Sequence, residues 1–333
     1  MPNIQDVARR AGVSPITVSR VINHSRYISQ KTVEKVEAAI AELGYVPNTL
    51  ARSLRSKRTQ TLALVLTDIT NPFFTTLARG VEDTASSAGF NVIFCNTDES
   101  EAKEQRYLQL LLQKQVDGML LVPARSRPDP VLTVRKQGTP VVVLDRCVPG
   151  VEADVVRCDS EDGAYRLVRL LLDLGHRRIA ALTGHTDVST AEDRAAGYRR
   201  ALAEAGLAGE ETVLYGAFNQ ESGYAMARQA LSLRPAPTGI FAANNFIAIG
   251  ALKALQEQGL SVPQDISMVA FDDLPPGLIT FSFMTVASQP AYEMGRVGTS
   301  LLLGRLSSAE PAPYQEIVLP IEIITRQSAG QAK

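Results

Sequence analysis

The chain has 333 residues, 45% of them hydrophobic, so it is long enough for two or three domains with sizeable cores. No apolar run approaches the ~20 residues that a membrane span needs, and the polar start is unlike a secretory signal, so we expect a cytoplasmic protein without membrane contact. The three cysteines and three histidines are scattered, which argues against disulfides, a bound metal and a metal cofactor.

The net charge of −1 conceals an uneven distribution. Residues 1–60 hold ten Lys and Arg against four acidic residues, which gives this segment +6 and leaves the rest of the chain at −7. A basic head on an acidic body predicts a polyanionic partner for the head. A solvated basic surface without a partner is the alternative on charge alone.

The first predicted elements are two short amphipathic helices. The apolar stripe of the first consists of Ile4, Val7, Ala8 and Ala11, and that of the second consists of Val18, Val21 and Ile22. Gly12 permits a tight turn between them. Asn3 and Ser14 are suited to cap the two helices, because their side-chain oxygens can accept from free backbone N–H groups.

A third helix is predicted from about Ser29 to Leu43, where Gly44 ends it. Two short helices joined by a glycine turn and braced by a third form a helix-turn-helix, whose second helix fits the DNA major groove. Its open side presents Pro15, Ile16, Ser19, Arg20 and Asn23. Arg20 can read guanine, and Asn23 a base edge or a phosphate. A helical bundle that binds protein is the alternative.

Residues 45–61, YVPNTLARSLRSKRTQT, predict a short helix after a proline. Asn48 can cap it, and such a helix is too short to be stable alone in water. Leu50 and Leu54 lie on one side among cations. We hypothesise that the segment is disordered in the free protein and becomes helical against operator DNA and a second copy of itself, with Leu54 wedged into a minor-groove step. An ordinary flexible basic linker is the alternative.

From Thr61 onward, apolar runs alternate with amphipathic helices. The runs of a first half are TLALVLT, FNVIFCNT, GMLLVP and PVVVLD, and those of a second half are RRIAALTG, TVLYG, TGIFAAN and ISMVAFDD. Such runs are typical of parallel sheets that helices cover on both faces. We therefore predict an α/β body of two similar halves, with a ligand cleft at the strand ends between them.

Polar residues fall at these strand ends, among them Asp68, Asn71, Asn96, Asp98, Asp145, Arg146, Asn244, Asn245, Asp272 and Gln289. Carboxylates, amides and an arginine suit a polyhydroxylated ligand, and Phe73, Phe74 or Phe218 can cover a sugar ring. Each aromatic residue is equally suited to the core.

The sequence resembles the lactose repressor/galactose repressor family of bacterial transcription regulators. The matching stretches are DVARRAGVSPITVSRVIN (6–23), YVPNTLARSL (45–54), NPFFTTLARGVEDTA (71–85), VDGMLLVP (116–123), DRAAGYRRAL (193–202) and FAANNFIAIGAL (241–252). The resemblance covers nearly the whole chain. It implies a helix-turn-helix headpiece over 1–47, a hinge helix and linker over 48–60, and a two-lobed, periplasmic-binding-protein-like body over 61–330, whose last strands, near 290–325, return to the first lobe.

The resemblance also implies the contacts. DNA contacts are expected from Asn3, Gln5, Ser14, Pro15, Ile16, Thr17, Ser19, Arg20, Asn23, His24, Tyr45, Asn48, Leu50, Ala51, Arg52 and Leu54. Effector contacts are expected from Phe73, Phe74, Asp145, Arg194, Phe218, Asn244, Asp272 and Gln289. Asp145, Asn244 and Asp272 can instead cap helices or turns, and Arg194 can instead pair with Glu192 or Asp193.

Two features depart from the family pattern. Asn244-Asn245 stands where members often have Asn-Asp, which removes a carboxylate near the pocket. The segment DDLPPGLITFSFMTV (272–286) is rich in proline and apolar residues. Because Arg146 and Arg194 lie near the predicted cleft, the effector can be either a sugar acid or a neutral sugar.

The sequence thus predicts a repressor of carbohydrate catabolism genes that binds a near-palindromic operator as a homodimer and is switched by a sugar or sugar acid. A sugar-modifying enzyme is the alternative, but the chain has no phosphate-binding glycine loop or nucleophile motif. A sugar transport protein would not explain the head.

Overall fold

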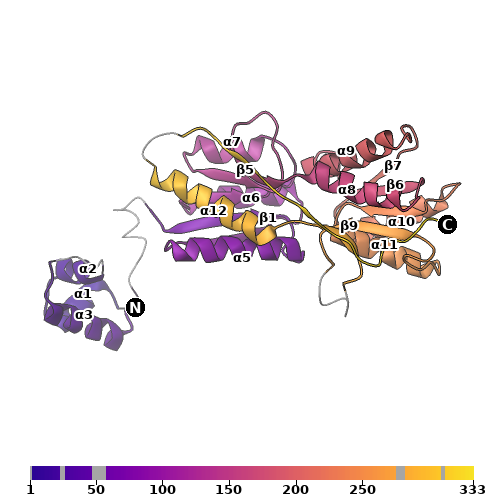
Figure 1. Cartoon of the computed structure of the whole chain (residues 1–333). Helices are drawn as coiled ribbons and strands as arrows, with labels where there is room; N and C mark the ends of the chain where they lie inside the picture. The colour runs from indigo at the N-terminus through magenta and orange to yellow at the C-terminus, as the bar shows by residue number, and fades with distance from the viewer. Residues whose placement is uncertain (1, 23–26, 47–57, 275–281, 309–311) are drawn as a thin grey trace. The chain divides into compact units, whose positions relative to one another are not determined.

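The computed structural model describes residues 2–22, 27–46, 58–274, 282–308 and 312–333, and it divides into two compact units, residues 1–59 and 60–333 (Figure 1). Asn23, His24 and the predicted hinge helix with Asn48, Leu50, Ala51, Arg52 and Leu54 lie outside the described residues.

The first unit contains the three predicted helices, α1 (Ile4–Ala11), α2 (Pro15–Ile22) and α3 (Gln30–Leu43). The Asn3 side chain accepts from the backbone N–H groups of Gln5 and Asp6, and the Asp6 carboxylate accepts from the Asn3 N–H. Gly12 ends α1 in the left-handed conformation, with φ of 69°. The helices bury one small core of Val7, Ala8, Val18, Val21, Val36 and Ala39.

The first lobe of the second unit is built on a six-stranded sheet of order β11-β5-β4-β3-β1-β2, in which the paired strands are parallel. Its strands are β1 (Thr61–Leu66), β2 (Asn91–Asn96), β3 (Gly118–Leu121), β4 (Val141–Leu144), β5 (Asp154–Cys158) and β11 (Glu316–Leu319). Its helices are α5 (Pro72–Ser87), α6 (Glu101–Gln113), α7 (Asp129–Lys136) and α12 (Ala291–Ser307).

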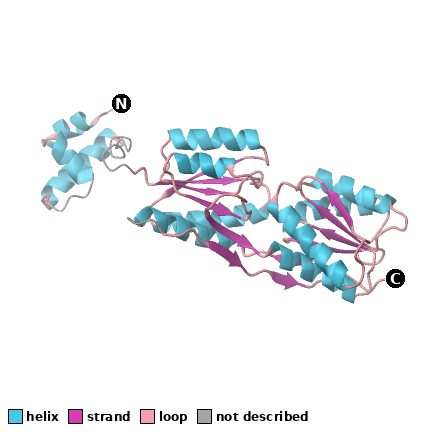
Figure 2. Ribbon diagram, turned by 90° about the horizontal axis from the view of Figure 1, so that it is seen from above, coloured by secondary structure: helices cyan, strands magenta, loops and turns pink. Residues whose placement is uncertain are grey.

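The second lobe repeats this plan with a sheet of order β12-β10-β9-β8-β6-β7, and helices cover both faces of each sheet (Figure 2). Its strands are β6 (Ile179–Thr183), β7 (Thr212–Tyr215), β8 (Gly239–Ala242), β9 (Ser267–Phe271), β10 (Thr285–Ser288) and β12 (Glu322–Ile324). Its helices are α8 (Ser160–Asp173), α9 (Ser189–Glu204), α10 (Gln220–Ser232) and α11 (Asn245–Glu257). The two-lobed α/β prediction is confirmed, with a strand at each of the eight apolar runs.

The chain crosses between the lobes three times, after β5, after β10 and after β11. The expectation that all strands near 290–325 return to the first lobe is wrong for β12. This strand pairs antiparallel with β10, Val286 opposite Ile324, and so extends the second sheet. Only α12 and β11 return, because β11 pairs with β5.

Two glycines allow close packing within the second lobe. A Cβ on Gly197 of α9 would collide with the backbone oxygen of Glu161 in α8, so glycine permits the close approach of these helices. A Cβ on Gly184 would overlap the ring of Phe218, so glycine leaves the space in which that ring lies. No helix within the described ranges is long and apolar enough to cross a membrane.

Candidate functional site

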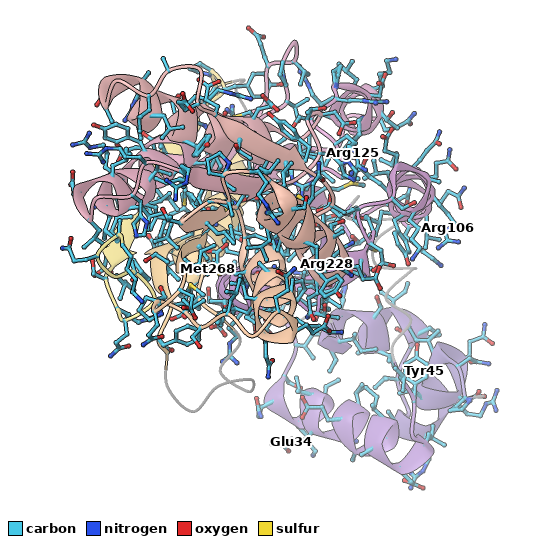
Figure 3. The ribbon with its side chains drawn as sticks, turned by 90° about the vertical axis from the view of Figure 1, so that its right-hand side faces the viewer. Glu34, Tyr45, Arg106, Arg125, Arg228 and Met268 are labelled. Carbon is cyan, nitrogen blue, oxygen red and sulfur yellow. The ribbon has the colours of Figure 1, made fainter. Side chains whose placement is uncertain are left out.

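The predicted DNA contacts that the structure describes lie mainly on α1 and α2. Gln5, Pro15, Ile16 and Arg20 are exposed, with Ile16 66% exposed, whereas Thr17 and Ser19 are half-buried. Asn3 and Ser14 act as helix caps, since the Ser14 hydroxyl accepts from the Thr17 N–H at 3.1 Å. Tyr45 packs half-buried against the headpiece core (Figure 3). An exposed arginine beside an apolar side chain can recognise a guanine and a thymine methyl.

A cavity of about 380 Å³ opens at the strand ends where the lobes face each other. All eight predicted effector contacts line it, namely Phe73, Phe74, Asp145, Arg194, Phe218, Asn244, Asp272 and Gln289. The other lining residues are Thr67, Asp68, Asn71, Asp98, Glu99, Arg125, Arg146, His185, Thr190, Ala217 and Asn219. The volume lies at the lower end of the range of roughly 300–1,000 Å³ typical of small-molecule sites.

Asp145 and Asp272 occupy equivalent positions in the two lobes. Asp145 follows β4 with φ of 65°, and Asp272 follows β9 with φ of 59°. This left-handed conformation is unfavourable for residues other than glycine and is concentrated at functional sites. Each turn directs a carboxylate into the cavity rather than continuing the strand.

Arg194 is a buried cation of the cavity, with 4% of its surface exposed. Its Nη1 donates to the Ala243 carbonyl at 2.6 Å, and its guanidinium lies 3.9 Å from the centre of the Phe271 ring. Burial lowers its pKa, against the charges of Asp272 and Asp145. The alternative ion pair with Glu192 or Asp193 is not found within 4.0 Å of Arg194, and Glu192 lies 4.0 Å from Arg199. The Arg194 Nε, which is buried, has no hydrogen-bond partner.

Asp272 is held by Gln289, whose Nε2 donates to both carboxylate oxygens at 3.1 and 3.0 Å. Burial raises the pKa of Asp272 to about 6, although Arg194 and Gln289 oppose the shift. Burial also raises the pKa of Asp145. The buried Gln289 Oε1 has no partner. The cavity thus offers carboxylate acceptors, and a guanidinium group and an amide lie in its wall.

Asn244 caps helix α11, which is the role that the sequence offered as the alternative to an effector contact. Its Oδ1 accepts from the Ile247 N–H at 2.8 Å, and its Nδ2 donates to the Phe218 carbonyl at 3.3 Å. The rings of Phe73 and Phe74 meet edge to face with centres 5.0 Å apart, and both are nearly buried. Phe218 is half-buried and remains the most accessible of the three rings.

Arg146 was a candidate partner for the carboxylate of a sugar acid, but its guanidinium is already bound within the protein. Its Nη2 donates to Glu99 Oε1 at 2.5 Å, and its Nη1 donates to the carbonyls of Pro123 and Ala124. The positive charge is therefore neutralised by the nearby Glu99. Glu99 also binds Arg125, whose Nη1 lies 3.3 Å from Glu99 Oε2.

Sequence reasoning missed several lining residues, notably Thr67, Glu99, Arg125, Thr190 and Asn219. Thr67 is the last residue of the run TLALVLT, and its buried hydroxyl has no partner. Its position at the end of a predicted strand could have identified it as a lining residue. Glu99 and Arg125 gave no such signal, because their contact spans 26 residues. Among the described residues, no group of His, Cys, Asp or Glu is placed to hold a metal ion.

Replacing Asp272 with asparagine should stabilise the free protein at pH 7. The folded-state pKa of about 6 lies above the ordinary 3.8, so ionisation of Asp272 costs up to about 3 kcal/mol of stability above pH 6. This cost is absent below the unfolded-state pKa, so the gain should disappear near pH 3.5. Urea unfolding at both pH values measures it. A variant less stable than the wild type at pH 7 would show that the carboxylate anchors the fold.

Comparisons with known proteins match both units. Residues 3–48 match the model described as bacterial regulatory proteins, lacI family, and residues 59–320 match periplasmic binding proteins and sugar binding domain of LacI family. The chain is 38% identical over 311 residues to the ribose operon repressor of Escherichia coli strain K12, covering 92% of this chain and 94% of that one. It is 37% identical over 312 residues to the transcriptional repressor PurR of Vibrio campbellii, covering 93% of each.

Among solved structures, the Lac repressor dimer bound to operator and the anti-inducer ONPF superimposes with a TM-score of 0.86 at 28% identity, over 99% of each chain. The family models match most of the chain, and the curated relatives exceed 30% identity over nearly their whole length. This chain therefore belongs to the LacI family of bacterial regulatory proteins, the ligand-responsive repressors of transcription.

Proposed function

We propose that the chain represses transcription by binding a near-palindromic operator as a homodimer, and that a neutral sugar in the interlobe cavity switches it. Residues 1–47 read the DNA, residues 48–60 link the head to the body, and the body senses the effector. The observation that carries the proposal is the cavity, in which carboxylates, a guanidinium and an amide with unpartnered atoms surround a half-buried ring. The relatives named above are repressors, and one is named for a ribose operon.

The charges of the cavity favour a neutral sugar over a sugar acid. Five carboxylates line it, against three guanidinium groups. Arg146 is paired with Glu99, Arg125 is paired with Glu99 and Asp187, and the charge of Arg194 is opposed by those of Asp145 and Asp272. An anion would therefore lie beside uncompensated carboxylates. Hydroxyl groups, in contrast, can donate to the carboxylates and accept from the Arg194 guanidinium.

Action by binding rather than catalysis fits the same chemistry. The Asp272 carboxylate accepts hydrogen bonds from Gln289, the charge of Arg194 acts on both Asp145 and Asp272, and Asn244 is occupied as a cap. The sequence carries no motif for a nucleophile that the carboxylates could activate.

The homodimer has a suitable surface on the first lobe. β2 is an edge strand of its sheet, and Ile93 and Phe94 on this strand are 39% and 41% exposed. Leu110 on α6 is also exposed. An edge strand with exposed apolar side chains is prone to pair with another chain. A second copy of this chain is the partner that satisfies a two-fold operator.

Replacing Phe94 with glutamate should weaken this dimer. A buried charge at an apolar contact costs about 2 kcal/mol or more, so the dimer dissociation constant should rise roughly 30-fold. Sedimentation velocity over a concentration series measures it. Leu132→Glu on α7, another exposed apolar position, is the control and should leave dimerisation unchanged. Equal effects of the two changes would remove β2 from the interface.

A thermal-shift screen of the full chain tests the ligand class. The panel contains neutral pentoses and hexoses, the matching sugar acids, and purines. A neutral sugar at 100 times its dissociation constant should stabilise the protein by about 2.7 kcal/mol. Stabilisation by a sugar acid or a purine alone would overturn the proposed ligand class.

A further inference from the structure

One pair of side chains joins the two lobes directly through two buried hydrogen bonds. Asn71 precedes α5 in the first lobe, and Asn245 begins α11 in the second. The Asn71 Nδ2 donates to Asn245 Oδ1 at 3.0 Å, and the Asn245 Nδ2 donates to Asn71 Oδ1 at 3.0 Å. The two residues are 5% and 1% exposed. Both lobes lose this contact if the cleft opens.

The orientation of each amide is fixed by backbone groups of its own lobe. Asn71 Oδ1 also accepts from the Phe73 N–H at 3.1 Å, and Asn245 Oδ1 also accepts from the Phe246 N–H at 2.8 Å. The Asn245 Nδ2 makes a further bond to the Asp273 carbonyl. Neither oxygen can therefore exchange places with its nitrogen without loss of a buried bond. The pairing needs an amide on both sides.

The pair lies against the wall of the effector cavity. Asn71 itself lines the cavity, and its neighbours Phe73 and Phe74 line it from the first lobe. Asn244 and Asp272, the residues beside Asn245 and Asp273, line it from the second lobe. A ligand that bridges the lobes thus closes the same gap that the amides close.

We propose that Asn71 and Asn245 form a latch that holds the lobes closed and positions the cavity walls for the effector. The single-atom change Asn245→Asp opens it, because a carboxylate oxygen then faces Asn71 Oδ1, which the Phe73 N–H holds in place. The change keeps the volume of the side chain. An aspartate in the first turn of α11 also favours that helix, so local unfolding is not expected.

Hydrogen exchange of the ligand-free full chain tests the latch without knowledge of the effector. Three other backbone amides bond across the lobes, namely Ser126 N–H to the Asp187 carbonyl, Ser189 N–H to the Ser126 hydroxyl and Cys147 N–H to the Ser189 hydroxyl. None contacts Asn71 or Asn245. In Asn245→Asp these amides should exchange roughly 10-fold faster, because the change removes a buried hydrogen bond and brings two acceptor oxygens together.

The matched control is Gln220→Glu, which makes the same amide-to-carboxylate change at the first residue of the neighbouring helix α10, on an exposed side chain outside the cavity. It should leave the exchange of the three cross-lobe amides unchanged. Exchange in Asn245→Asp that equals the wild type, or that rises only near residues 71–74 and 245–248, would overturn the latch.

A double-mutant cycle with Asn71→Ser and Asn245→Ser supplies a second test, since serine preserves the cap of α5. The double variant should exchange no faster than either single variant, whereas independent, additive effects would contradict a shared bond. One readout rests on the proposed function: the apparent affinity for the sugar selected by the thermal screen should fall in Asn245→Asp in proportion to the loss of the closed fraction of the protein. If no sugar binds, the proposed function fails while the exchange result still decides the latch.

Discussion

Replacing Arg194 should abolish the response of operator binding to effector while leaving operator binding itself in place. Its buried guanidinium lines the cavity, and its charge acts on the carboxylates of Asp145 and Asp272. A hydrogen bond to a charged group contributes about 1.5–3 kcal/mol, so loss of the contacts to one ligand should weaken effector binding roughly 100-fold. Effector titrations of a fluorescent operator complex measure the loss.

Arg194→Ala removes a buried cation whose charge acts on Asp145 and Asp272, and the loss can destabilise the body. Arg194→Lys is therefore the decisive variant, because it keeps the charge and loses the planar fork of donors. Arg199→Ala, on the same helix but outside the cavity, is the control and should respond as the wild type does. A normal effector response in Arg194→Lys would assign Arg194 a structural role only.

The second large effect is expected at Arg20. This side chain is exposed on α2, beside Ile16, and the chain belongs to a family of DNA-binding regulators. If Arg20 reads a guanine, Arg20→Ala should weaken binding to the specific operator by about 1–3 kcal/mol and relax the preference at one base pair. Binding to unrelated DNA should fall far less.

Selection of operators from a random library, followed by anisotropy titrations on the selected duplex and its single-base variants, measures both effects. Arg9→Ala on α1 is the comparison, since Arg9 is exposed but has its charge beside Asp6 at 3.5 Å. A uniform loss on every DNA sequence in Arg20→Ala would make Arg20 a phosphate contact.

Local patterns predicted much of this structure because the interactions behind them span few residues. The caps of Asn3 and Ser14 and the turn at Gly12 depend on groups within four or five positions. The eight apolar runs became strands because both faces of each sheet are covered. β5 was not predicted, since it carries Asp154 and Arg157 among its five residues.

The site was predictable in position and less so in chemistry. Strand ends indicated where Asp145, Asp272 and Gln289 would lie, and all three line one cavity. The sequence could not predict hydrogen-bond partners that come from distant parts of the chain. Arg146 bonds to Glu99, which is 47 residues away in the sequence, and Asn71 bonds to Asn245, which is 174 residues away. The first contact bears on the charge of the ligand and the second on the coupling between the lobes, so neither property could be predicted from the sequence.

The central claim is that a neutral sugar in the interlobe cavity controls operator binding. The most direct measurement is the operator affinity of the full chain, with and without a saturating concentration of the sugar selected by the thermal screen, in the wild type and in Arg194→Lys. The account predicts a change of at least tenfold, equivalent to about 1.4 kcal/mol of coupling, in the wild type and none in the variant. An operator affinity that the sugar leaves unchanged in the wild type, or changes equally in both proteins, would contradict it.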